Sequence, residues 1–153
     1  MKGMKREEGL SILLAAENSF IRYYFSRLFE KRHSLRMTAS GVAAISELSK
    51  KPYDLVFINE YLPDTGMAEL LEAVGRCRPD AKSVVMLTHR EDADHLIARH
   101  GAAGVMIKPF TVLDMLRLAE RVLPAGASQN LIAPDALKLC PVMPQGGAAG
   151  TKG

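Results

Sequence analysis

Tryptophan is absent from this chain of 153 residues, and only two cysteines are present, Cys77 and Cys140. The two cysteines lie far apart and show no metal-binding spacing, which argues against a disulfide-stabilised secreted domain and against a cysteine-based metal site. No apolar stretch reaches the length of a membrane span, and residues 1–8 lack the apolar core of a signal peptide. We therefore expect a reduced, cytoplasmic protein without a membrane segment.

A strong excess of charge is also lacking. The formal net charge is +3, and the basic residues are scattered along the chain. Scattered charges of this kind are typical of solvated helix faces and are too weak to indicate direct binding to nucleic acid. Hydrophobic residues make up 48% of the chain and charged residues 24%, as in ordinary soluble globular proteins. The length suits one domain with a packed core.

Short apolar runs alternate with helical patterns between residues 10 and 123. The runs predict β-strands at residues 10–16, 34–39, 55–58, 84–87 and 103–107. Apolar residues at helical spacing predict helices that begin near Ser19, Ser40, Met67, Ala93 and Val112, with Ser19 as the cap of the first. This alternation predicts an α/β fold, a doubly wound five-stranded parallel sheet in the flavodoxin-like order 2-1-3-4-5.

The two ends of the chain differ from this central part. Residues 1–9 form an N-terminal extension, residues 10–123 the domain, and residues 124–153 a tail rich in proline, glycine and alanine. We expect the tail to be flexible, apart from one helical turn over residues 134–139. Because the periodic apolar pattern ends at Leu123, truncation after about residue 125 is expected to leave a folded domain.

Polar residues follow four of the predicted strands. Glu17 and Asn59 end the first and third strands, and Thr88 and Lys108 end the fourth and fifth. The carboxyl ends of parallel strands meet at one edge of the sheet, and ligands bind there at the switch point of the strand order. The sequence therefore predicts a polar pocket at this edge.

The order of these strand ends resembles the receiver domain of bacterial two-component response regulators. The resemblance covers residues 10 to 123 and rests on three segments, Asp54-Leu-Val-Phe-Ile-Asn59, Ser83-Val-Val-Met-Leu-Thr88 and Gly104-Val-Met-Ile-Lys108-Pro109-Phe110. It implies that Lys108 corresponds to the lysine that contacts the phosphoryl group, and Thr88 to the hydroxyl residue that moves towards it. It also implies a cis peptide between Lys108 and Pro109, which an X-Pro bond permits.

This chain departs from the family at the residues that carry the chemistry. The position of the phosphate-accepting aspartate is Asn59, and the acidic pair that holds magnesium is replaced by Ala16 and Glu17. An amide is a weak nucleophile that forms no acyl phosphate, and one carboxylate gives too little charge to hold magnesium. The aromatic switch position of the family is Val105. We expect a degenerate pseudo-receiver that is not an enzyme and has no cofactor or magnesium ion, with Lys108 paired to Glu17 or to the Asn59 oxygen.

The resemblance then implies a signalling module that acts through protein–protein contacts, independently of phosphorylation. In the family, partners and dimers use the face built from the fourth helix, the fifth strand and the fifth helix, here residues near 90–100 and 112–122. Protein partners on this face are expected, with a homodimer as a further option, and direct contact with nucleic acid or membrane is not.

Two alternatives remain open at this point. The pocket near Lys108, Thr88 and Asn59 could bind an anion or another small molecule and act as a sensor. A weaker alternative retains phosphorylation at a substitute acid, Glu17 or Asp64.

Overall fold

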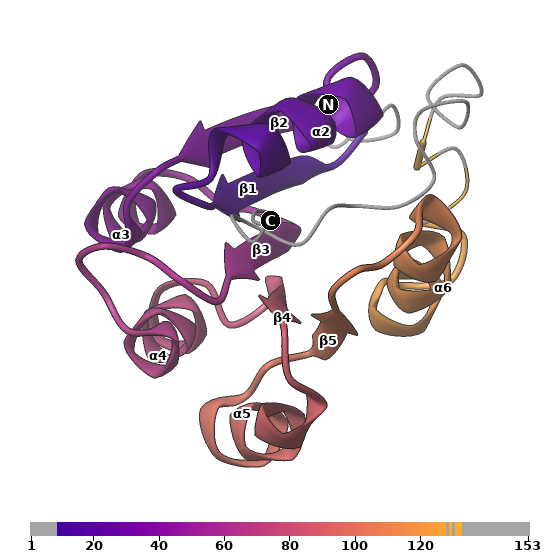
Figure 1. Ribbon diagram of the computed structural model, residues 1–153. Helices are drawn as coiled ribbons and strands as arrows, with labels where there is room; N and C mark the ends of the chain where they lie inside the picture. Colours follow the sequence, from indigo (N-terminus) through magenta and orange to yellow (C-terminus); the bar gives the residue numbers. More distant parts are fainter. Residues whose placement is uncertain (1–8, 128, 130, 133–153) are drawn as a thin grey trace.

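The computed structural model describes residues 9–127, 129 and 131–132 (Figure 1). In chain order the elements are β1 (Ser11–Ala15), α2 (Ser19–Phe29), β2 (Ser34–Thr38), α3 (Gly41–Lys50), β3 (Leu55–Asn59), α4 (Met67–Cys77), β4 (Lys82–Leu87), the 3-10 turn η2 (Arg90–Asp92), α5 (Ala93–His100), β5 (Gly104–Ile107) and α6 (Val112–Val122). None of the described helices has the length and apolar character needed to cross a bilayer.

The strands form one parallel sheet in the order β2-β1-β3-β4-β5, which confirms the predicted doubly wound, flavodoxin-like fold. The chain passes from β1 outward to β2 and then returns across β1 to β3. In register, Ile12 of β1 lies beside both Leu35 of β2 and Leu55 of β3. The strand order therefore reverses between β1 and β3, and the crevice of this fold class opens at their carboxyl ends.

Successive side chains of the central strands point to opposite faces and build two separate cores. One core lies under α2 and α6 and takes Ile12, Leu14 and Phe57 from the sheet. The other lies under α3, α4 and α5 and takes Leu13 and Ile58. All five residues of β3 are buried. Burial on both faces explains why the central strands read as continuous apolar runs in the sequence.

Helix ends follow the predicted signals with one correction. Ser40 caps α3 by accepting a hydrogen bond from the Ala43 N–H, as its residue type predicts. The cap of α2 is Asn18, not Ser19, because the Asn18 side-chain oxygen accepts from the N–H groups of Phe20 and Ile21. Asparagine and serine are nearly equal as caps, so adjacent candidates are not separated by residue type.

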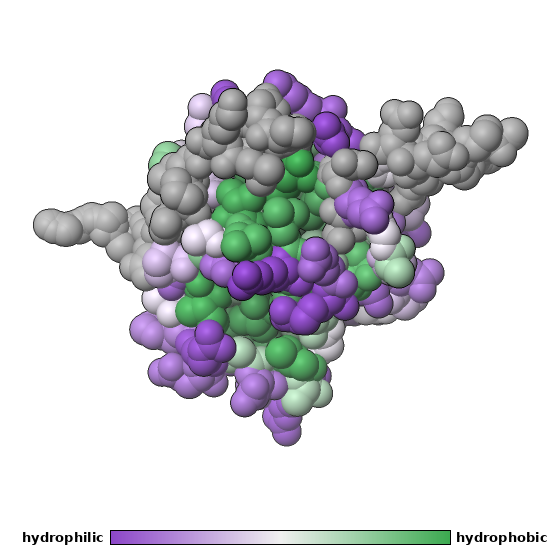
Figure 2. Space-filling model, turned by 90° about the vertical axis from the view of Figure 1, so that its right-hand side faces the viewer, coloured by the Kyte–Doolittle hydropathy of each residue, from purple (hydrophilic) through white to green (hydrophobic). Residues whose placement is uncertain are grey.

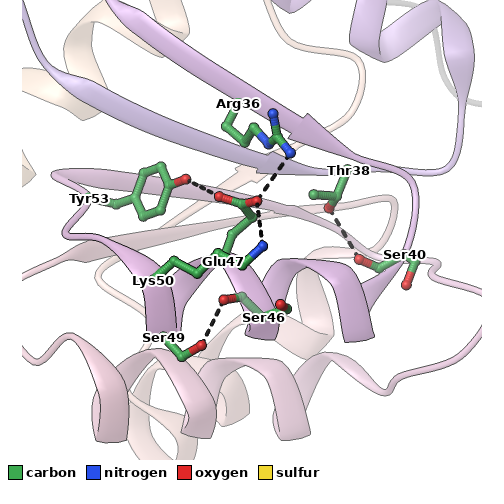
Figure 3. A network of polar contacts seen from close by, with 8 residues as sticks. All are labelled: Arg36, Thr38, Ser40, Ser46, Glu47, Ser49, Lys50 and Tyr53. Atoms are coloured by element: carbon green, nitrogen blue, oxygen red, sulfur yellow. Dashed lines mark hydrogen bonds and ion pairs between the residues drawn. The ribbon is translucent and has the colours of Figure 1, made fainter.

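A buried carboxylate ties α3 to the edge strand β2 (Figure 3). Glu47 accepts a hydrogen bond of 2.8 Å from the Tyr53 hydroxyl and lies 3.2 Å from an Arg36 guanidinium nitrogen. The Tyr53 hydrogen bond is the main cause of a lowered pKa of Glu47, and burial is the main cause of a raised pKa of Tyr53. A buried carboxylate requires such partners, so this network holds α3 and β2 in place.

The packed core extends beyond the boundary that the periodic pattern predicts. Leu131 is 1% exposed and Ile132 is 6% exposed, and both belong to the core under α2 and α6. His33 fixes this Leu131–Ile132 segment, because its Nε2 lies 2.6 Å from the Leu131 carbonyl oxygen while its Nδ1 accepts the Leu10 N–H. The helical turn predicted over residues 134–139 lies outside the described residues.

Candidate functional site

The five predicted pocket residues lie at the carboxyl ends of neighbouring strands, as the sequence indicates. Asn59 is the last residue of β3, and Ala16 and Glu17 follow β1. Thr88 follows β4, and Lys108 follows β5. Asn59 and Lys108 are buried, Thr88 is half-buried and Glu17 is exposed. The sheet therefore brings these positions to one edge, although Glu17 turns out to solvent.

Asn59 places a buried, uncharged amide at the end of β3. It is 6% exposed, and its Oδ1 is buried without a hydrogen-bond partner among the described residues. Ala16, at the end of the adjacent strand, is fully buried and donates its N–H to the Thr38 carbonyl. These two positions therefore offer one amide and one methyl group, and no carboxylate.

A guanidinium group binds the carboxyl end of β1. Arg22, in the first turns of α2, donates from Nη1 to the carbonyl oxygens of Ala16 at 2.8 Å and Glu17 at 2.7 Å. A fixed positive charge at this point disfavours a second cation nearby. Sequence reasoning missed Arg22, because its residue type alone gives no signal that it folds back over the strand end.

Glu60 is the second residue at this edge of the sheet that sequence reasoning missed. Its Oε1 accepts the Thr88 N–H at 2.6 Å, and its Oε2 accepts the Thr88 hydroxyl. The same Oε2 lies 3.8 Å from Lys108 Nζ, which forms an ion pair across the ends of β3, β4 and β5. We call this arrangement of Glu60, Thr88 and Lys108 the carboxylate clamp.

The clamp corrects the expected partner of Lys108. Glu60 forms an ion pair with it, and the Asn59 oxygen accepts no hydrogen bond from any described residue. Burial is the main cause that lowers the pKa of Lys108, and the Glu60 carboxylate acts in the opposite direction. Glu60 lies close to Thr88 and Lys108 because of the way β3 pairs with β4, where Asn59 is in register with Met86. Glu60, the residue that follows β3, is thereby brought level with the end of β4. The Lys108–Pro109 peptide is cis, as the resemblance implies.

The Asp64 side chain accepts hydrogen bonds at the start of α3. Its carboxylate accepts the Ser40 hydroxyl at 2.6 Å and the Gly41 N–H at 2.9 Å. The Ser40 hydrogen bond is the main cause of a lowered pKa of Asp64. The loop approaches so closely that a Cβ on Gly41 would lie 2.4 Å from the Thr65 Cβ. The structure thus gives Asp64 a capping role through hydrogen bonds to another element.

Comparison with known proteins finds similar structures but no similar sequence families. No protein-family model and no curated protein sequence matches the chain. Among solved structures, it is similar to the signal receiver domain of an HD domain-containing protein from Pseudomonas fluorescens, with 18% identity, a TM-score of 0.66 and coverage of 73% of this chain and 85% of the other. A CheY-like response regulator receiver domain from Methanospirillum hungatei gives 20% identity, a TM-score of 0.62 and coverage of 72% and 94%. The chain has the receiver fold.

A further solved structure with the receiver fold contains a magnesium ion. The receiver domain of a sensor histidine kinase from Pseudomonas aeruginosa, solved with magnesium in its active site cleft, is 16% identical to this chain with a TM-score of 0.58. The alignment covers 74% of this chain and 97% of the other. In the present chain, the described residues contain no group of three or more His, Cys, Asp or Glu side chains able to hold a metal ion. The absence of magnesium binding remains a prediction.

A groove lies beside the pocket on the α5–β5–α6 face of the receiver fold. Its cavity volume is about 670 Å³, and its lining includes Val105 and Ile107 of β5 and Ile97 of α5. Lys108 of the carboxylate clamp also lines it. Val105, which the resemblance places at the aromatic switch position, is half-buried. The pocket and the groove are therefore contiguous through the end of β5.

Proposed function

We propose that this protein is a receiver-like signalling module of the two-component type that acts through protein–protein contacts without phosphorylation or enzymatic activity. The observation that carries the proposal is the buried amide of Asn59 at the end of β3. An amide oxygen cannot form the acyl phosphate on which a carboxylate-based switch depends. Ala16 supplies no carboxylate at the neighbouring strand end, so magnesium would lack a principal ligand. A cytoplasmic location accords with this role.

The groove on the α5–β5–α6 face supports partner binding. Its lining combines the apolar side chains of Ile97, Val105 and Ile107 with charged ones, the basic Arg90, Arg117 and Arg121 and the acidic Asp94 and Asp114. Apolar side chains beside arginine side chains are a common composition of protein interfaces. Figure 2 views the molecule from the side that carries α6, and apolar surface gathers in the middle of that face with hydrophilic side chains around and across it. A partner protein or a second copy of the chain could use this surface.

A second candidate is an anion sensor, favoured by one observation. Thr88 and Lys108 together offer an N–H, a hydroxyl and an ammonium group at one point. In the present structure these donors serve Glu60, so an external anion would have to displace a carboxylate of the protein itself. We therefore rank this candidate second. Phosphorylation at Glu17 or Asp64 ranks third, because Asp64 is engaged at the start of α3.

Incubation of the full chain with acetyl phosphate and magnesium tests independence from phosphorylation. We expect no mass increase in intact-protein mass spectrometry. A hydroxylamine-labile increase of one phosphoryl group would contradict the proposal. Mapping that group to Glu17 or Asp64 would establish the substitute-acid alternative.

A pair of surface variants tests the interaction face with partners captured from the native cell. Ile97, in the groove, is 45% exposed, and Val42, on α3, is 59% exposed. Ile97→Asp should abolish capture because it replaces an exposed apolar side chain of the groove with a charge, whereas Val42→Asp should leave capture unchanged. Equal capture by both variants would contradict the assignment of the face.

A further inference from the structure

Strand β2 forms one edge of the sheet and pairs with β1 alone among the described strands (Figure 1). The Ser34 N–H and the Thr38 carbonyl form hydrogen bonds with the chain at the two ends of β1. Because ladder groups alternate along a parallel strand, the N–H and C=O groups of Leu35 and Met37 point away from β1. No described strand meets them on that side. The edge therefore offers main-chain donors and acceptors to one further strand.

The side chains of β2 alternate between the two faces of the sheet. Leu35 and Met37 are half-buried and pack against the core under α2 and α6. Arg36 lies on the opposite face, where its guanidinium meets Glu47 of α3 (Figure 3). A strand added at this edge would continue the alternation, with one set of side chains beside Leu35 and Met37 and the other set beside Arg36.

Positive charge exceeds negative charge on the α3 side of this edge. Arg36 and Lys50 share the Glu47 carboxylate, at 3.2 Å and 3.9 Å, and their side chains are 60% and 64% exposed. Lys51 is also exposed and lies 5.2 Å from the centre of the Tyr53 ring. Glu47 is the only acid among residues 34–51, and it is buried. Three basic side chains thus accompany one buried carboxylate, and the excess positive charge is exposed.

This charge selects between the strands that could add to the edge. Antiparallel pairing of β2 with β2 of a second copy would bring Arg36, Lys50 and Lys51 of both copies to one face of the joined sheet. Like charges across a strand pair are destabilising, whereas opposite charges are stabilising. An acidic strand from another protein meets complementary charge at the same positions, so it is favoured over a second copy.

We propose that the outer edge of β2 binds an extended acidic segment of a partner protein as an additional strand. The main chain of the segment pairs with the N–H and C=O groups of Leu35 and Met37. Alternate residues of the segment are Asp or Glu and face Arg36 and the lysines at the end of α3, and the residues between them are apolar and cover Leu35 and Met37. This surface goes beyond the proposed function, because β2 and the β5 strand of the groove lie at opposite edges of the sheet.

The test is a titration of the full chain at low ionic strength with a short synthetic peptide that alternates glutamate and valine. Binding is followed by the NMR shifts of the Leu35 and Met37 amides. A peptide of the same length that alternates lysine and valine is the control for charge. Arg36→Gln removes a positive charge beside the added strand, and Arg76→Gln is its matched control, because Arg76 is exposed on α4.

A second pair of variants tests main-chain pairing. Met37→Pro removes an N–H that points outward and places a proline ring at the edge, which an edge strand tolerates without losing a bond to β1. Met37→Ala also shortens the side chain but keeps the N–H. Binding to both variants is followed at the Leu35 amide, and circular dichroism checks that each variant is folded.

We expect saturable shifts at the Leu35 and Met37 amides with the glutamate–valine peptide and binding of the lysine–valine peptide that is about tenfold weaker. Arg36→Gln should lower the affinity about threefold, and Arg76→Gln should leave it unchanged. Met37→Pro should lower the affinity about tenfold or more, whereas Met37→Ala should lower it by no more than about threefold. Saturating peptide should also protect the Leu35 N–H from hydrogen exchange, which contact through charged side chains alone would not do.

Several outcomes would overturn the proposal. One is the absence of saturable shifts at Leu35 and Met37, and another is equal affinity for the two peptides. Equal binding by Met37→Pro and Met37→Ala would place the contact away from the strand edge. Should Met37→Pro fail to fold, hydrogen exchange of the Leu35 amide in the native chain decides, because no protection by saturating peptide would refute strand addition.

Two further results separate this proposal from its neighbours. Shifts at the Leu35 and Met37 amides that grow with protein concentration in the absence of peptide would assign the edge to a second copy and overturn the acidic partner. Phosphorylation of the native chain by acetyl phosphate would overturn the proposed function but would leave the outcome of the peptide titration unaffected.

Discussion

The Leu131–Ile132 segment gives the sharpest test of the structure, through the substitution Leu131→Ala. Leu131 is 1% exposed and packs in the core under α2 and α6. Truncation of a buried leucine to alanine removes apolar contact and leaves a cavity, at a cost of about 2–5 kcal/mol. A domain of this kind has a total stability of about 5–15 kcal/mol, so the loss is a large fraction of it.

The assay is equilibrium unfolding in urea, followed by circular dichroism. With a slope of about 2 kcal/mol per molar urea, a loss of about 3 kcal/mol lowers the unfolding midpoint by roughly 1.5 M. Leu113→Ala is the matched control, because Leu113 lies on α6 and is 53% exposed. Its midpoint should move by no more than about 0.5 M, since exposed substitutions cost little.

Comparable midpoints for the two variants would refute the packing of the segment. Truncation after residue 125 gives a second comparison. The periodic pattern predicts that it is harmless, whereas the buried side chains of Leu131 and Ile132 predict a loss at least as large as that of Leu131→Ala.

Three further predictions concern the pocket and the segment. Burial is the main cause that lowers the pKa of His33 below its ordinary value of 6.5, with Arg32 acting in the same direction and the Leu131 carbonyl and Asp54 acting in the opposite one. The contribution of His33 to the free energy of unfolding should therefore be fully present above pH 6.5 and be lost as the pH falls through the folded-state pKa. Urea unfolding at several pH values measures this dependence, and His33→Gln should make it weaker. Asn59→Asp alone should recover little phosphorylation, whereas Asn59→Asp with Ala16→Asp should restore magnesium binding, and a double variant without a magnesium-dependent NMR change would contradict the alignment of β1. Lys108→Ala should lower the free energy of unfolding by about 1–2 kcal/mol. Although Lys108 lines the groove, its side chain is only 3% exposed, so partner binding should stay nearly unchanged, and loss of binding with an intact fold would favour the sensor alternative.

Periodicity predicted the fold because burial on two faces leaves a direct trace in the sequence. Leu13 and Leu14 face different cores, and both are fully buried, so β1 had to be an unbroken apolar run. The positions of Asn59 and Lys108 at the pocket followed from the same rule, since each is the first polar residue after such a run.

Contacts between residues far apart in the chain could not be predicted from the sequence pattern. Glu60 is an acidic residue in a loop, and only the pairing of β3 with β4 shows that it meets Thr88. Leu131 and Ile132 are two adjacent apolar residues without a period, so no local pattern distinguishes a packed pair from an exposed one. Their burial depends on the surface that α2 and α6 present, which is a property of the assembled fold.

His33 has a consequence for how this domain is joined to anything else. One imidazole ring contacts both Leu10, at the entrance to β1, and Leu131, where the described chain ends. The two attachment points therefore lie a single side chain apart, at the amino-terminal edge of β1 and a strand length from the pocket. A host chain into which residues 10–132 are inserted would therefore enter and leave at the edge away from Asn59. The same closeness makes a circular permutant that links these two points with a short bridge, and opens the chain elsewhere, geometrically feasible.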